Sequence, residues 1–393
     1  MGTVTASGSS KLFDSDAAAR EAVRAALQGL GGRQPSVGFL FASPAHDLGR
    51  ALRAAREASR ATVIGCSTAG EITERGLTHG GLALLLVASD TITAHAGFSL
   101  GLRSDARSVA DRLDHGLAEA GEAAANDGRP HLTSVVLADG LAGTGERLVD
   151  DLHGRGVQGA QIVGGAAGDE GKFQSTVVGA DTQAARDAVA ALHVFDATRW
   201  GVGVNHGLRP TTARMRVTRA TGNVVHELDG RPAFSAYQEH AATRGVDLAR
   251  ERASPYLIGN ELGVHSFDKI ERVRAPLRAG SDGSLSCAAE IPTGSMVSIL
   301  DGDPDSMIHA ARAAATEAKQ GLGERRAAGV LLFDCVCRGM ILKSKFQREL
   351  EAVRSTFGDV PVAGFLTYGE IARYRRRRDG WHNATAVVVA IPA

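Results

Sequence analysis

Two segments of the chain share a pattern of glycine, threonine and glutamate that could bind a small polar ligand. Gly65–Ile72 and Gly364–Ile371 both read G-x-x-T-x-G-E-I, and each follows a strand–helix–strand pattern. Backbone N–H groups in a glycine-rich loop can approach an anion closely. The glutamate carboxylate at the same offset could hold an ammonium group. The two loops therefore suggest a site for a zwitterion such as an amino acid.

A second interpretation of these loops is purely structural. Their glycines could supply turns with positive φ, and each glutamate could cap a helix or pair with a nearby arginine. A shorter version of the loop, Gly164–Asp169, also follows a predicted strand. Open α/β sheets bind ligands beyond the carboxyl ends of their strands. The recurrence of the loop in this context favours the binding interpretation.

The cysteines and the arginine beside them offer other chemistry. A nucleophilic Cys66 would need a histidine base, and no G-x-S-x-G elbow surrounds it, so we expect a buried thiol. Cys335 and Cys337 would face one side if the strand predicted before them continued. No second Cys/His pair has zinc spacing, which argues against a structural metal. Arg338 could pair with a ligand carboxylate or form a surface ion pair.

Two polar segments near the C-terminus complete the candidates. The four arginines Arg375–Arg378 are typical of a solvated hairpin tip in a neutral protein. His382 and Asn383 precede the last predicted strand and could ligate, hydrogen-bond or cap. The nucleotide motifs G-x-G-x-x-G and the P-loop do not occur. Covalent c-type haem is excluded, because the sequence contains no Cys-x-x-Cys-His.

The composition limits the class of protein. The 393 residues contain 44 Lys+Arg and 44 Asp+Glu, so the net charge is zero and a global nucleic-acid footprint is not expected. Four cysteines in a chain of this length do not make a disulfide scaffold. We find no signal peptide, and the apolar runs are shorter than the ~20 residues of a membrane helix. We expect a reduced, cytoplasmic protein without membrane insertion.

Hydrophobic periodicity predicts the elements that must position these residues. Helices are expected over 16–30, 46–59, 106–120, 146–152, 231–240, 304–319 and 342–357. Strands are expected over 37–42, 61–64, 81–88, 91–98, 134–138, 161–163, 188–195, 200–205, within 211–229, and over 296–300, 329–334, 360–363 and 384–391. The sequence therefore predicts an α/β (α+β) fold with mixed sheets, two related α/β halves and an internal pseudo-repeat.

The residues singled out above resemble those of the FIST sensory proteins. The N-terminal resemblance rests on Val63–Ile72 and Ile162–Asp169. The C-terminal resemblance rests on Cys335-x-x-Arg338, Gly364–Ile371 and His382-Asn383-x-Thr385. It implies a lead-in helix in residues 1–30, a FIST N-like domain over 31–208 and a FIST C-like domain over 209–393.

This resemblance implies a bacterial or archaeal signal-input module that binds a small ligand without catalysis. Amino acids are the ligand class usually proposed. Since no output domain follows in this sequence, we expect the signal to pass to a separate histidine kinase, cyclic-dinucleotide enzyme or chemotaxis-type receptor. The motif positions carried over as ligand-binding candidates are Cys66, Ser67, Thr68, Gly70, Glu71, Gly164, Gly165, Asp169, Cys335, Arg338, Thr367, Tyr368, Gly369, Glu370, His382 and Asn383.

Two alternatives remain open from the sequence. Some proteins similar to this family bind haem and sense nitric oxide, and here His382 or Cys335 would be the axial ligand. A cysteine-dependent enzyme would instead use Cys66 or Cys335, and it would require a thiol of perturbed pKa.

Overall fold

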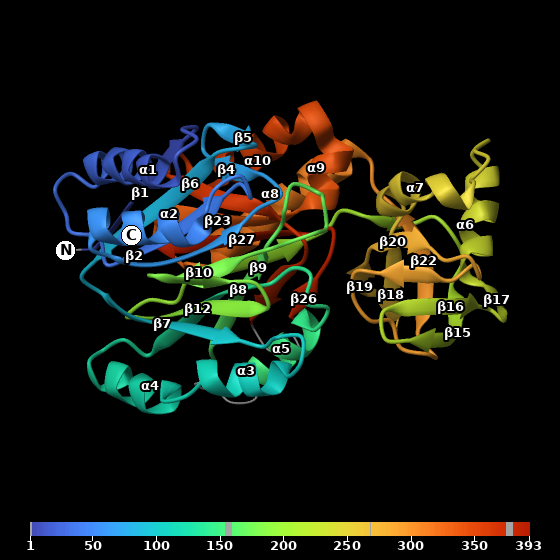
Figure 1. The fold of residues 1–393 in the computed structure, drawn as a ribbon, viewed down its shortest axis with the longest axis horizontal. Helices are drawn as coiled ribbons and strands as arrows, with labels where there is room; N and C mark the ends of the chain where they lie inside the picture. The colour runs from blue at the N-terminus through green and yellow to red at the C-terminus, as the bar shows by residue number, and fades with distance from the viewer. Residues whose placement is uncertain (1, 154–158, 268, 375–379) are drawn as a thin grey trace.

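The computed structural model of the chain describes residues 2–153, 159–267, 269–374 and 380–393. Three six-stranded mixed sheets and their helices form a body, and a fourth, nine-stranded sheet forms a small domain over residues 209–301. In Figure 1 this small domain lies to one side of the body. The predicted mixed α+β architecture is confirmed.

The body repeats one folding unit: edge strand, helix, strand, helix, strand, a short two-stranded arm and a returning strand. In the first unit, β2 and β3 are parallel, and the returning β6 lies between β1 and β2. Its elements are β1(Thr3–Ser10), α1(Ser15–Gly29), β2(Val37–Ala42), α2(Leu48–Ser59), β3(Thr62–Ser67), the arm β4(Glu71–Thr73) and β5(Gly76–Thr78), and β6(Leu82–Ser89).

Two further units follow the same plan, so the predicted internal repeat is confirmed and has a third copy. The second contains β7(Ile92–Leu100), α3(Ala106–Leu113), α4(Leu117–Asn126), β8(His131–Ala138), α5(Gly145–His153), β9(Gln161–Ala166), the arm β10(Val178–Ala180) and β11(Gln183–Ala185), and β12(Ala188–Asp196). The third contains β13(Gly201–Asn205), α8(Pro304–Gly321), β23(Ala327–Cys335), α9(Val336–Leu342), η2(Lys343–Lys345), α10(Phe346–Phe357), β24(Val362–Thr367), the arm β25(Glu370–Arg373) and β26(Trp381–His382), and β27(Ala386–Pro392).

The arms are exchanged between the three units in a closed cycle. The first unit's β4 pairs with β24 of the third unit, the second unit's β10 pairs with β3 of the first, and the third unit's β25 pairs with β9 of the second. Every body sheet is therefore completed by a strand from another unit. The glycine-rich loops lead into these arms, so the exchange gathers all three loops at one place.

Local sequence explains where the helices of the body begin and end. The carboxylates of Asp14, Asp47 and Asp303 accept hydrogen bonds from backbone N–H groups in the first turns of α1, α2 and α8. The single helix predicted over 106–120 is instead two helices, because Gly116, with φ of 73°, interrupts it. Capping residues thus fix the helices that apolar periodicity had predicted.

The small domain is inserted into the third unit, between β13 and α8. Its core contains Val217, Phe234, Tyr237, Leu257 and Ile299. Its elements are β14(Arg209–Pro210), β15(Met215–Thr221), β16(Val224–Leu228), β17(Arg231–Pro232), α6(Ala233–Ala242), η1(Arg250–Arg252), α7(Ser254–Gly259), β18(Leu262–Ser266), β19(Lys269–Arg274), β20(Pro276–Ala279), β21(Leu285–Cys287) and β22(Met296–Asp301). The domain boundaries proposed from sequence stay predictions.

The structure corrects one predicted helix and resolves other local features that the sequence left open. The strand ending at Cys335 does not continue through Cys337, because the chain turns into α9 at Val336. The helix predicted from residue 342 begins only at Phe346, after α9 and the short η2. The strands β6 and β7, adjacent in sequence, belong to different sheets. The first 30 residues also hold β1 ahead of the predicted helix.

None of the helices in the described ranges is both long and apolar enough to span a bilayer.

Candidate functional site

The three glycine-rich loops meet where the exchanged arms cross. The N–H of Ala69 donates to the carbonyl of Leu366 at 3.0 Å, and the N–H of Gly168 donates to the carbonyl of Ser67 at 2.9 Å. A third bond, from the N–H of Ala166 to the carbonyl of Gly369, is 2.7 Å long. Because these N–H groups bond to the other loops, they hold the three units together and are not presented to an anion.

Glycines at equivalent positions of the loops allow close strand contacts. A Cβ atom would lie 1.9 Å from the carbonyl oxygen of Val136 at Gly164 and 1.8 Å from that of Leu332 at Gly364. Real Cβ atoms do not approach a neighbour this closely, so a side chain would push the parallel strands apart. Glycine is therefore required at these two positions because the neighbouring strand leaves no room for a side chain.

Glu71 and Glu370 are buried and bonded within the protein. Glu71 accepts a hydrogen bond of 2.6 Å from Thr68, and Glu370 accepts bonds of 2.5 Å from Thr367 and 2.8 Å from the hydroxyl of Thr385. Burial raises the pKa of each carboxyl to about 7. Each glutamate is thus partnered by a threonine, whereas the structural interpretation of the sequence considered a helix cap or an arginine partner. The ligand-binding role of the two glutamates stays a prediction.

Asp169 and Tyr368 join the second loop to the third. The Tyr368 hydroxyl donates to the buried Asp169 carboxylate and accepts a 2.9 Å bond from the N–H of Gly171. The Tyr368 ring stacks on Phe173 with centroids 4.4 Å apart. This loop contact forms one wall of the cleft described below.

Arg338 is at the centre of a buried ion cluster in the third unit. Its guanidinium donates two bonds of 3.1 and 2.7 Å to Glu349, and its Nε lies 2.9 Å from Asp334. It also donates to the carbonyls of His206 and Met307, at 2.8 and 2.9 Å. The carboxylate partner of Arg338 is thus an internal one, and the alternative of a surface ion pair is wrong, because α9 and α10 enclose the side chain.

A cleft lies between the body and the small domain, and we call its mostly apolar part the inner compartment. Its volume is about 170 Å³. Asn383 is 1% exposed, and its Oδ1 has no hydrogen-bond partner within the described part of the chain. The other residues that line it are mostly apolar or carry thiols, among them Leu141, Phe173, Ile258, Leu277, Cys287, Ala288, Cys335, Val336, Cys337, Met340 and Tyr368.

Two thiols that line the inner compartment, those of Cys287 and Cys335, have raised pKa values. Burial raises the pKa of Cys287 to about 12. A hydrogen bond with Cys337, together with burial, raises the pKa of Cys335 well above its ordinary value. Burial also raises the pKa of Cys66, which lies elsewhere, inside β3. Because the thiolate is the nucleophile, these cysteines present polarizable, nearly apolar walls at neutral pH.

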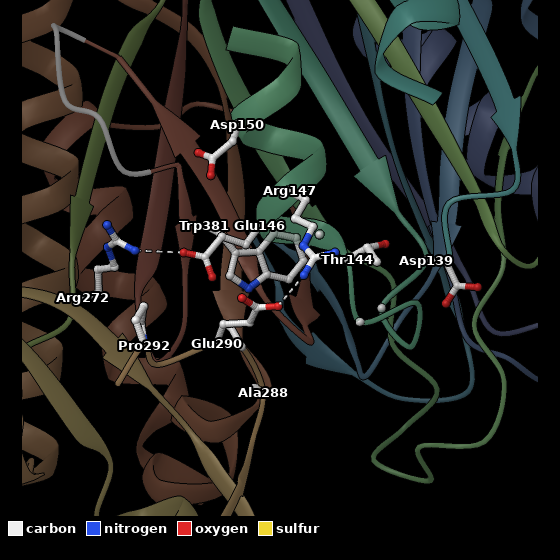
Figure 2. A pocket seen from close by; sticks show the side chains of 14 residues that line it. Asp139, Thr144, Glu146, Arg147, Asp150, Arg272, Ala288, Glu290, Pro292 and Trp381 are labelled. Carbon is white, nitrogen blue, oxygen red and sulfur yellow. Dashed lines mark hydrogen bonds and ion pairs between the residues drawn. The ribbon is translucent and has the colours of Figure 1, made fainter. Parts of the chain in front are cut away.

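The other part of the cleft, which we call the outer compartment, carries charges of both signs (Figure 2). Its volume is also about 170 Å³, and it shares Gly140, Gly143 and Ala288 with the inner compartment. The other residues lining it are Asp139, Thr144, Gly145, Glu146, Arg147, Asp150, Arg272, Ala289, Glu290, Pro292 and Trp381. The two compartments therefore adjoin at a junction with little side-chain bulk.

Ion pairs cross the outer compartment from α5 to the small domain. Arg147 lies 3.0 Å from Glu290, and Glu146 lies 3.0 Å from Arg272. Glu146 also lies 2.8 Å from the buried Arg274, which in turn donates to the backbone carbonyl of Trp381. These contacts join the second unit, the small domain and the third unit's arm.

The structure brings only part of the predicted set into the cleft. Cys335, Tyr368 and Asn383 line the inner compartment, whereas the other candidates lie in the loop junction, the Arg338 cluster or adjacent strands. The ring of His382 is buried, and its Nε2 lies 3.1 Å from the carbonyl of Ala372. Sequence reasoning missed the charged residues of the outer compartment. The one feature of the sequence that could have pointed to Trp381 as a residue of the site was its position next to the candidate His382.

A haem group does not fit the candidate ligands in this arrangement. The inner compartment beside Cys335 is comparable to an apolar cavity of ~150 Å³ that holds one benzene molecule, and a porphyrin contains four rings. The His382 Nε2 already contacts a backbone carbonyl. In the described ranges, no three His, Cys, Asp or Glu side chains are grouped as metal ligands. The predicted hairpin tip at 375–378 lies outside the described residues.

Comparisons with known proteins place the chain in a family. Residues 36–231 match the FIST N domain, and residues 233–373 match the FIST C domain. An uncharacterized protein of Methanocaldococcus jannaschii, MJ1623, is 34% identical over 94 residues, which are 24% of this chain and 18% of that protein. Uncharacterized proteins of Mycobacterium bovis (Mb0898c) and Mycobacterium tuberculosis (MT0897) are each 28% identical over 192 residues, 47% of this chain.

The chain spans 48% of the length of the two mycobacterial relatives. The two domain matches adjoin each other and together cover most of the chain. They include the glycine-rich loops and the Cys335 and Arg338 motif that suggested the resemblance, whereas Asn383 lies beyond the matched residues. FIST domains are associated with sensing in signal transduction. The chain therefore belongs to the FIST family of sensory domains.

Proposed function

We propose that this chain is a non-enzymatic sensor that binds an amino acid or a related small carboxylate in the cleft between the body and the small domain. The observation that carries this proposal is the pairing of two adjoining compartments, one charged and one nearly apolar, where two structural parts meet. Binding sites are commonly concave, mostly apolar and furnished with a few polar groups. The unpartnered Oδ1 of Asn383 is such a group.

The position of the cleft supports a signalling role. Arg147–Glu290 and Glu146–Arg272 link the two walls. A charged ligand could form an ion pair with one of these side chains in place of its present partner. Such a ligand would bind two orientations of the small domain with different affinity. Such a difference is what allows a ligand to shift a conformational equilibrium. The resulting surface change would be read by a separate partner in the cytoplasm, such as a histidine kinase, a cyclic-dinucleotide enzyme or a chemotaxis-type receptor.

An enzymatic role is less well supported by the chemistry of the site. The raised pKa values of Cys66, Cys287 and Cys335 favour protonated thiols. A cysteine nucleophile is normally activated by a lowered pKa or an adjacent base. The cysteines of this chain therefore support packing and ligand contact better than covalent catalysis.

Thermal unfolding against a ligand panel tests the proposal. The panel contains the amino acids, small carboxylates and haemin, and hits are measured again by isothermal titration calorimetry. A ligand at ~100 times its Kd adds about 2.7 kcal/mol to stability. A selective shift by an amino acid or carboxylate is the expected result. A shift with haemin alone, or with no compound, would contradict the proposal.

A pair of variants locates the binding site. Asn383→Leu removes a carboxamide whose oxygen bonds to no described residue, so the fold should tolerate the change while affinity falls. Asn126→Leu makes the same chemical change at an exposed position at the end of α4 and should leave affinity unchanged. Equal affinity in both variants would show that the ligand binds elsewhere.

A further inference from the structure

We infer that the cleft selects amino acids with apolar side chains, because it combines a carboxylate site at the N-terminus of α5 with a mostly apolar compartment. The ligand carboxylate would lie beside Trp381, and its side chain would enter the inner compartment. This assignment rests on the proposed function, and it adds which part of the ligand each compartment binds.

The first observation is the position of α5. Its first turn, Gly145–Arg147, and the preceding Thr144 all line the outer compartment. The first N–H groups of a helix have no acceptor within the helix, and the helix dipole makes this end favourable for an anion. Arg147 adds a positive charge at the same place. A carboxylate is the anionic group that an amino acid would present there.

The second observation is Trp381, which is independent of the helix. Its side chain is 7% exposed, yet its indole nitrogen has no hydrogen-bond partner among the residues that the structure describes. An indole N–H can only donate, and a buried donor without an acceptor is costly. In Figure 2 the ring lies among the charged side chains, with its nitrogen edge toward Glu290. A ligand carboxylate would supply the missing acceptor.

Two glycines fix the orientation of this ring. A Cβ atom would lie 2.2 Å from the ring at Gly145 and 2.4 Å from it at Gly369. The indole is therefore packed directly against the backbone at the start of α5 and against the third loop. The edge of the ring that carries the N–H therefore packs beside the third loop, and the opposite edge packs against the start of α5.

Groups for the ammonium lie on the opposite wall. Glu290 is paired with Arg147 at 3.0 Å, and their side chains are 43% and 68% exposed. Exposed ion pairs contribute little, so a zwitterion can replace this pair by placing its carboxylate at Arg147 and its ammonium at Glu290. The exchange keeps every charge partnered.

The inner compartment then accepts the side chain, and a further N–H of the ammonium at the junction would donate to the unpartnered Oδ1 of Asn383. The junction with the outer compartment is lined by Gly140, Gly143 and Ala288, which leaves room for a ligand α-carbon. The walls beyond it are mostly apolar, and burial of an unpaired charge in such surroundings is costly. The volume of about 170 Å³ suits a branched aliphatic, thioether or aromatic group. Charged side chains are excluded on the same grounds.

Calorimetric titration of the full chain tests this assignment. L-leucine, L-methionine and L-phenylalanine should bind at least tenfold more tightly than L-glutamate, L-lysine and isopentylamine, which is leucine without its carboxylate. Trp381→Phe keeps an aromatic side chain but removes the indole N–H, and it should weaken leucine binding about tenfold or more, as expected for a lost bond to a charged group.

The second tryptophan provides a matched control. Trp200 donates to Asp196 at 3.0 Å in a different part of the body, so Trp200→Phe should alter stability without altering leucine affinity. If Trp381→Phe does not fold, Leu277→Phe tests the other end of the site. That change narrows the inner compartment and should reduce affinity for phenylalanine more than for alanine.

The outcomes separate this inference from the proposed function. Preferential binding of glutamate or lysine, equal binding of leucine and isopentylamine, or unchanged leucine affinity in Trp381→Phe would overturn the inference and leave a small-ligand sensor. Failure of every amino acid and carboxylate to bind would overturn both.

Discussion

Replacing Arg338 with methionine should destabilise the body strongly, because the guanidinium contacts two buried carboxyl groups. Methionine keeps much of the aliphatic stem but leaves Glu349 and Asp334 without their counter-ion. Removing one partner of a buried ion pair costs about 3–5 kcal/mol. The carbonyls of His206 and Met307 also lose a donor, and each unsatisfied buried group costs a further ~1–3 kcal/mol.

The summed loss is comparable to the whole stability of a typical folded protein, about 5–15 kcal/mol. Urea unfolding followed by circular dichroism should therefore show a much lower midpoint for Arg338→Met, or no folded protein. Arg338→Lys keeps the charge but loses the planar fork, and its midpoint should lie between those of Arg338→Met and the parent protein.

Arg348→Met on α10 is the matched control. Arg348 pairs with Asp305 at 3.1 Å, but the two side chains are 56% and 72% exposed. Exposed pairs contribute at most about 1 kcal/mol, so this midpoint should hardly move. If Arg338→Met were as stable as Arg348→Met, the conclusion that the cluster holds β23, α9 and α10 together would be refuted.

Three other predictions concern the loops and thiols. Burial raises the pKa values of Glu71 and Glu370 to about 7. The native state therefore binds more protons than the unfolded state between about pH 4.5 and 7. The free energy of unfolding, measured by urea titration, should fall as pH rises through this window, by up to ~1.4 kcal/mol per pH unit for each group. Glu370→Gln should make this pH dependence shallower, and an unchanged dependence on pH would count against the burial argument. Gly364→Ala forces a Cβ to 1.8 Å from the carbonyl of Leu332 and should abolish the soluble fold, whereas Gly259→Ala meets no atom within 4 Å and should express normally. All four cysteines are buried, so alkylation at neutral pH should be slow until urea is added, and one rapidly modified thiol in native protein would contradict this.

Much of the body could be predicted from sequence because its helices and longer strands carry their own signals. The run over Val37–Ala42 is apolar throughout, and Asp303 caps α8 as expected. The exchanged arms carry no such signal. Strands as short as β4 and β10 show no periodicity, and their partners β24 and β3 are determined by contacts between distant units.

The candidate site was predictable only where a motif marked it. Asn383 and Cys335 were identified by their motif positions and do line the inner compartment. Glu290 and Arg147 come from different structural parts, and nothing in their local sequence indicates that they meet. Arg338 was considered for a surface pair because local sequence does not reveal Glu349, eleven residues later, as its buried partner.

The cyclic exchange of arms also bears on how the protein is made. During synthesis the second sheet keeps an unpaired edge along β9 until β25, Glu370–Arg373, has been translated. Domains commonly fold as units as the chain leaves the ribosome, and unpaired strand edges favour aggregation. The exchange delays closure of the ring until β25 has been translated. Folding of the body is thereby tied to synthesis of the third unit, and termination before β25 would leave an open sheet edge that chaperones and proteases could recognise.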